Sequence, residues 1–82
     1  MHFYTGRVYG IGSSSGTIQE RRTKENAHKK AKELKYDFTA ASVTFVNCEF
    51  EDLEKGDTVL FSLTCFDGKP VIDTIEMPVY DL

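Results

Sequence analysis

The strict alternation of residues 58–65 most constrains what this chain can fold into. In this run, the apolar set Val59, Phe61, Leu63 and Cys65 alternates with Thr58, Leu60, Ser62 and Thr64, of which three are polar. Successive side chains of a β-strand point to opposite faces, so a period of two predicts a strand with one buried face. The following Phe-Asp-Gly-Lys-Pro at 66–70 predicts a hairpin turn, and residues 71–77 predict the returning strand. The C-terminal part of the chain is therefore expected to be antiparallel β-structure.

Three segments in the first half also have strand character. Residues 3–11 alternate β-branched or aromatic residues with polar ones, with a bulge expected at Gly10, and a turn of glycine and serine at 12–16 leads into a strand over about 16–21. Residues 34–39 predict a third strand that directs Tyr36 and Phe38 into the core. Between this strand and residue 58, the sequence predicts a helical turn at 40–43, a connection with some strand character at 44–50 and an acidic turn at 51–57.

A strongly basic segment separates the second and third predicted strands. Residues 20–35 contain seven bases and three acids, a charge of +4, whereas residues 36–82 contain ten acids and two bases, a charge of −8. Together with Arg7 these charges sum to −3. Two interpretations of residues 23–34 remain open: a helix capped by Thr23 with an apolar stripe at Ala27, Ala31 and Leu34, or a solvated loop.

Size and composition indicate one small cytoplasmic domain over residues 1–82. Eighty-two residues suit a single core. No apolar run reaches the roughly 18–20 residues of a membrane span, and the N-terminus lacks the layout of a signal peptide. The 17-residue separation of Cys48 and Cys65 fits no zinc motif. We therefore expect two free thiols and no bound metal.

The order of motifs resembles that of the cold-shock domain family. Gly6-Arg7-Val8 is similar to the opening Gly-Lys-Val of that family, and residues 16–18 (Gly-Thr-Ile) stand where its first motif ends in Gly-Phe-Ile. Residues 53–61 are similar to Leu-x-x-Gly-x-x-Val-x-Phe, and residues 68–75 to the final Gly-x-Pro and apolar strand. The resemblance implies an all-β, five-stranded antiparallel barrel of the oligonucleotide/oligosaccharide-binding (OB) type that binds single-stranded RNA or DNA.

The sequence departs from the family at the exposed aromatics on which bases stack. The resemblance places Gly10 at a tryptophan position, a serine at the next aromatic position, and Thr17 at the phenylalanine of Gly-Phe-Ile. In the second motif Asp37 replaces the exposed phenylalanine, and Thr39 and Ala40 replace the histidine and last phenylalanine. Each stack is worth roughly 1–3 kcal/mol, so the loss of four predicts an affinity about three orders of magnitude lower.

Two hypotheses about function follow. The first is weak, non-sequence-specific binding of single-stranded nucleic acid through phosphate contacts, with the contact residues Arg7, Tyr9, Arg21, Arg22, Lys24, Lys29, Lys30, Lys32 and Lys35. The alternative is a protein-interaction or structural module that binds no nucleic acid, which the net charge of −3 favours. No catalytic constellation, phosphate loop or calcium loop is recognisable, so the sequence predicts neither an enzyme nor a cofactor.

Overall fold

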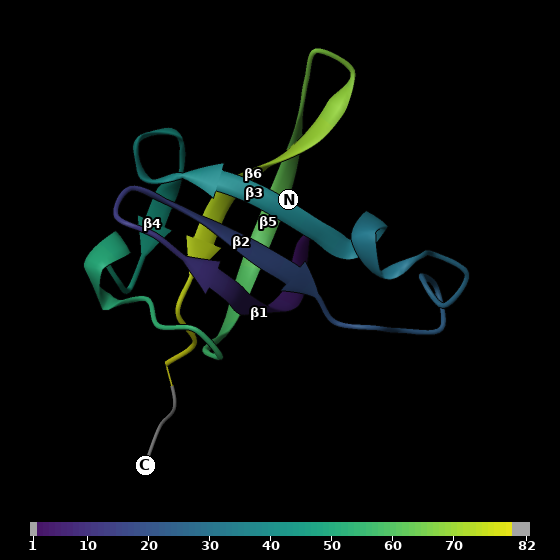
Figure 1. The fold of residues 1–82 in the computed structure, drawn as a ribbon, viewed down its shortest axis with the longest axis horizontal. Helices are drawn as coiled ribbons and strands as arrows, with labels where there is room; N and C mark the ends of the chain where they lie inside the picture. The colour runs from purple at the N-terminus through teal and green to yellow at the C-terminus, as the bar shows by residue number, and fades with distance from the viewer. Residues whose placement is uncertain (1, 80–82) are drawn as a thin grey trace.

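The computed structural model describes residues 2–79, so residue 1 and residues 80–82 of the predicted domain lie outside the described range. Six strands and three short 3₁₀ helices make up the fold (Figure 1). In chain order they are β1 (Phe3–Ile11), β2 (Ser15–Glu20), η1 (Ala31–Leu34), β3 (Lys35–Thr39), η2 (Ala40–Ser42), β4 (Thr44–Val46), η3 (Phe50–Asp52), β5 (Thr58–Phe66) and β6 (Lys69–Glu76). The prediction of an all-β fold is confirmed.

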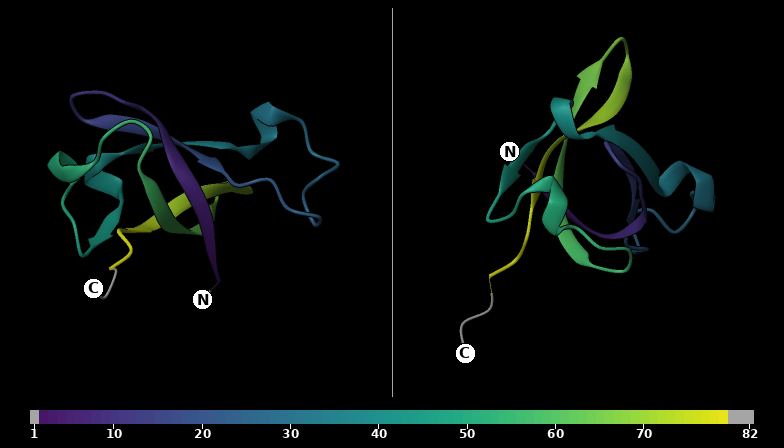
Figure 2. Two further views of the ribbon diagram at one scale, coloured as in Figure 1. Left: turned by 90° about the horizontal axis from the view of Figure 1, so that it is seen from below. Right: turned by 60° about the vertical axis from the view of Figure 1, so that its left-hand side comes forward.

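All six strands belong to one sheet with the order β3-β2-β1-β5-β6-β4. Neighbouring strands are antiparallel except β4 and β6, which are parallel. The two edge strands, β3 and β4, are joined by only residues 40–43, so the sheet must curl until its edges approach each other, as Figure 2 shows. The predicted five-stranded antiparallel barrel is wrong: within residues 2–79 the sheet has six strands, one pair is parallel, and the ladder is not closed between its edges.

Irregularities in two strands accompany the curvature of the sheet. The register of β1 with β2 shifts between Val8 and Gly10, where the sequence predicted a bulge. The register of β5 with β6 shifts between Ser62 and Leu63. Such bulges increase the local twist and bend a strand, which allows a six-stranded sheet to wrap around one core.

The core fills the concave side of this curled sheet. Phe61 lies at its centre, fully buried, and the rings of Tyr4 and Tyr36 pack at centroid distances of 5.6 and 5.8 Å from it. The prediction that Phe38 and Tyr36 face the core is confirmed, although Tyr36 is only half-buried. The other buried hydrophobic residues of this cluster are Val8, Ile18, Leu53, Val59, Ile72 and Ile75.

Residues 21–34 form a loop whose side chains are mostly exposed, rather than a helix. Only the single 3₁₀ turn η1 is helical, and of the predicted apolar stripe only Leu34 is buried, while Ala27 and Ala31 are exposed. The segment is organised around Asn26, which is 4% exposed. Its Nδ2 donates to Glu20 Oε2 (2.8 Å) and to the Arg21 carbonyl (3.0 Å), and its Oδ1 accepts from the Thr23 amide (2.7 Å). Of the two interpretations left open for residues 23–34, the helix is therefore wrong and the exposed loop is confirmed.

The β5–β6 hairpin extends beyond the curled sheet (Figure 1). Its turn places Asp67 and Gly68 at φ values of 52° and 74°. Two consecutive positive φ values are the requirement of the tightest two-residue hairpin turn, which the Asp-Gly pair meets readily. The predicted hairpin is confirmed, with strands one to two residues longer than expected toward the turn.

Candidate functional site

Three polar side chains form a row across the convex face of β1, β2 and β3. Arg7 pairs with Gln19, and Gln19 pairs with Lys35 on the next strand. Residues in register on neighbouring strands project from the same face of a sheet. Two of the predicted contact residues, distant in sequence, are thereby brought together on the face opposite the core.

Tyr9 lies beside this row and is 51% exposed. The ammonium group of Lys35 lies over its ring, 4.1 Å from the centroid, which is the geometry of a cation–π contact. The sequence predicted Tyr9 as a nucleic acid contact residue, but one face of its ring is already covered by Lys35. A base that stacks on that face must first displace Lys35.

The basic residues of 21–35 are not equivalent. Arg22 turns back into its own loop, where its guanidinium Nη1 donates to the carbonyls of Asn26 (3.0 Å), Ala27 (3.4 Å) and Lys29. Lys29 is half-buried. The remaining predicted contacts on this segment are exposed: Arg21, Lys24, Lys30 and Lys32. Arg22 thus shapes the loop through bonds to its backbone.

A shallow groove of about 500 Å³ joins the row to the start of the basic segment. Its lining includes the three arginines Arg7, Arg21 and Arg22, with Glu20 as its acidic member. Glu20 is engaged, because its carboxylate accepts from Asn26 and from the hydroxyl of Tyr36 (3.3 Å). Burial and then the charge of Glu20 raise the pKa of Tyr36 to about 12, so this hydroxyl stays protonated at neutral pH.

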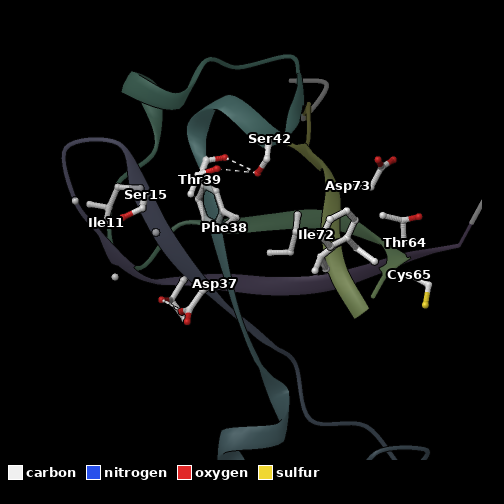
Figure 3. Close-up of a pocket in the computed structure, with 16 residues that line it drawn as sticks. Ile11, Ser15, Asp37, Phe38, Thr39, Ser42, Thr64, Cys65, Ile72 and Asp73 are labelled. Carbon is white, nitrogen blue, oxygen red and sulfur yellow. Dashed lines mark hydrogen bonds between the residues drawn. The ribbon is translucent and has the colours of Figure 1, made fainter. Parts of the chain in front are cut away.

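A second and larger pocket, of about 960 Å³, opens between the β1–β2 turn, β3 and the β5–β6 hairpin. Figure 3 shows Ile11 and Ser15 on one side, Thr64, Cys65 and Asp73 on the other, and Phe38 and Ile72 between them. The sixteen residues that line it include two acids, Asp37 and Asp73, and no base. Its apolar residues are Ile11, Phe38, Phe66, Val71 and Ile72.

The carboxylate of Asp37 is held in place at the rim of this pocket. The Thr17 hydroxyl donates to its Oδ1 at 2.6 Å, across the β2–β3 pairing. On the opposite wall, the Thr74 hydroxyl donates to Asp73 Oδ2 at 3.2 Å. Both acids therefore present their remaining acceptor positions from fixed side chains, since an ionised carboxylate has about four such positions and no donor.

Sequence reasoning missed this pocket. Phe66 is 68% exposed although it is a large aromatic residue, and Ile11 is also exposed. Both lie at strand ends next to turns, where Phe66 pairs with Lys69 and Ile11 pairs with Gly16. The position of Phe66 next to the tight Asp-Gly turn was the one sequence feature that indicated an exposed aromatic. That it lines a pocket follows only from the tertiary structure, which places β3 opposite the hairpin.

The two cysteines are free, as predicted, and differ in accessibility. Cys65 is exposed at the lining of the large pocket, whereas Cys48 is half-buried and burial raises the pKa of its thiol. Within residues 2–79 no three His, Cys, Asp or Glu side chains come together in a way that could hold a metal ion. In the same range, no helix has the length and apolar character needed to cross a membrane.

No protein-family model matches this chain, and no curated protein matches it.

Proposed function

We propose that the chain is a divergent cold-shock-like domain that binds single-stranded RNA or DNA weakly, by its convex face and the adjoining basic segment. The observation that supports this most is the row of Arg7, Gln19 and Lys35 across three strands, continued by the exposed cations of residues 21–32. A positive strip of this length can follow a phosphate backbone without reading its sequence.

Affinity is expected to be low because the same face offers little for bases to stack on. Thr17 and Asp37 occupy one cross-strand pair of the face, and Tyr9 is partly covered by Lys35. Asp37 also repels a phosphate that approaches it. Phosphate contacts therefore supply most of the binding, which makes it sensitive to salt.

The test is an amide-shift titration of the intact chain by NMR with a seven-nucleotide oligo(dT), at about 50 and 200 mM salt, the range over which phosphate contacts weaken steeply. We expect shifts in β1–β3 and residues 21–35 at low salt that fade at high salt. The double variant Arg7→Gln/Lys35→Gln should lose most of the binding. The matched control Lys55→Gln/Lys69→Gln removes the same charge from exposed lysines outside both grooves and should retain binding.

A protein-interaction module is the second candidate, favoured by the open edge of the sheet. Among residues 2–79, strand β3 pairs only with β2, so its other side presents backbone groups that no described strand pairs. Exposed Ile11 and Phe66 lie in the pocket beside it. Such an edge can accept an extended segment from a partner. If oligo(dT) leaves the spectrum unchanged at about 50 mM salt, nucleic acid binding is ruled out and this candidate replaces it.

A further inference from the structure

We infer that the large pocket between β3 and the β5–β6 hairpin binds one unpaired base of the nucleic acid strand, that this base is guanine, and that Asp37 determines the preference. This inference rests on the proposed function, and it adds a base-reading site to a face that otherwise contacts only phosphates.

The walls of the pocket suit the flat apolar faces of a base. Phe66 contributes an exposed ring from the hairpin, and exposed Ile11 lies on the other side. Phe38 and Ile72, which are 5% and 4% exposed, lie between the two sides (Figure 3). A volume of about 960 Å³ lies within the usual range of small-molecule sites, which are mostly apolar with a few polar groups that fix orientation. An aromatic ring can stack on any base, so these walls favour entry without selecting among bases.

Selection comes from the carboxylates. Asp37 and Asp73 accept hydrogen bonds and cannot donate when ionised. The Watson–Crick edge of guanine presents two adjacent donors, N1–H and N2–H, which match the two oxygens of one carboxylate. Uracil and thymine present one N–H between two carbonyl oxygens, and those oxygens are repelled by a carboxylate. Because the hydroxyl of Thr17 fixes the Asp37 side chain, this acceptor is ready before the base arrives.

The placement of charge fits a nucleotide in one orientation. Lys35 and Asp37 lie two residues apart on the same face of β3, roughly 7 Å along the strand. The pocket lining contains no lysine, arginine or histidine side chain that would attract a phosphate. Lys35, in contrast, belongs to the basic row with Arg7. The phosphate is therefore held on the row while its base enters the pocket.

The experiment compares three heptanucleotides at about 50 mM salt: oligo(dT), the same strand with a central dG, and the same strand with a central deoxyinosine, which lacks the N2 amino group. We expect the dG strand to bind about tenfold more tightly than oligo(dT), in line with the discrimination of a paired donor–acceptor contact, and the inosine strand to lose most of that gain. Alkylation of exposed Cys65 should be slowed by the dG strand, with Cys48 as an internal comparison.

The decisive variant is Asp37→Asn, with Asp67→Asn as its control. Asp37→Asn should abolish the preference for dG while leaving oligo(dT) binding equal or stronger, because it removes a charge from the phosphate-binding face. Asp67 lies at the hairpin turn outside the pocket, and asparagine tolerates its positive φ, so Asp67→Asn should retain the preference. Binding of oligo(dT) without a preference for dG would overturn this inference alone. Binding of neither strand would overturn the proposed function as well.

Discussion

At the scale of single residues, Gly6 lies where the packing of the sheet against the core leaves no space for a side chain. A Cβ atom built there would lie 2.7 Å from side-chain carbons of Ile18 and Phe61 and 2.9 Å from the Gln19 carbonyl oxygen. At Gly10, four residues further along the same strand, no atom lies within 4 Å of the equivalent position. The two glycines on one strand therefore make a matched pair.

We expect Gly6→Ala to lower the free energy of unfolding by about 1–3 kcal/mol, because the methyl group forces the core to shift. Gly10→Ala should change it little, since the bulge leaves open space at that position. Urea denaturation followed by circular dichroism measures both. Equal stability of the two variants would contradict the packing of β1 against Phe61.

Tyr36 provides a pH-dependent prediction at the same scale. Burial and Glu20 raise its pKa to about 12 in the folded protein, from the ordinary tyrosine value of 10.0. Above pH 10 the unfolded chain loses this proton before the folded one does, so this contribution to stability is complete below pH 10 and is lost as the pH rises toward 12. The ring-carbon NMR shifts of Tyr36 should titrate near pH 12. Titration near pH 10 would contradict the contact with Glu20, and Tyr36→Phe serves as the assignment control.

At the scale of elements, the conformation of the basic segment depends on the side-chain amide of Asn26. Asn26 links Thr23, Glu20 and the Arg21 carbonyl, and Arg22 adds bonds to the carbonyls of the same loop. The segment is therefore tied to the end of β2 although it contains little regular structure. This arrangement keeps its lysines next to the convex face.

We expect Asn26→Ala to cost about 1–3 kcal/mol of stability, because it leaves buried partners of the amide unsatisfied. Asn26→Asp should cost more at neutral pH, since it preserves shape but places a second carboxylate against Glu20. Amide hydrogen exchange should show faster exchange in residues 21–30, with β5 and β6 protected as before. Unchanged protection in this segment would show that the Asn26 bonds do not organise the loop.

At the scale of the whole molecule, the basic and acidic residues that are separated in the sequence are also found at different places on the surface. The convex face carries the row of Arg7 and Lys35, while Asp37 and Asp73 line the adjoining pocket. The net charge of −3 thus coexists with a local positive strip. Binding through this strip should leave a measurable signature in its dependence on salt.

The logarithm of the oligo(dT) association constant should fall linearly with the logarithm of the salt concentration. Each phosphate contact on a single strand contributes about 0.7 to the slope, so Arg7→Gln/Lys35→Gln should reduce it by about 1.4. Fluorescence anisotropy over a salt series measures the slope. A slope that this double variant leaves unchanged would place the phosphate contacts elsewhere.

The sequence by itself determined five of the six strands, β1, β2, β3, β5 and β6. The period of two over residues 58–65, the Asp-Gly turn and the bulge at Gly10 depend on neighbours within a few positions, so they could be predicted correctly. The same holds for the inward direction of Phe38. The distribution of charged residues along the sequence also showed that cations concentrate in residues 20–35 and acids in residues 36–82.

Only the tertiary structure decided how those strands meet and what they enclose. Strand β4 has three residues, too few for a period, and exists through its parallel pairing with β6. Residues 23–34 do not form a helix because their helix propensity is weak and the hydrogen bonds of the buried Asn26 side chain hold the segment in another conformation. The large pocket brings β3 to the β5–β6 hairpin, segments about thirty residues apart, and such non-local contacts leave no local pattern.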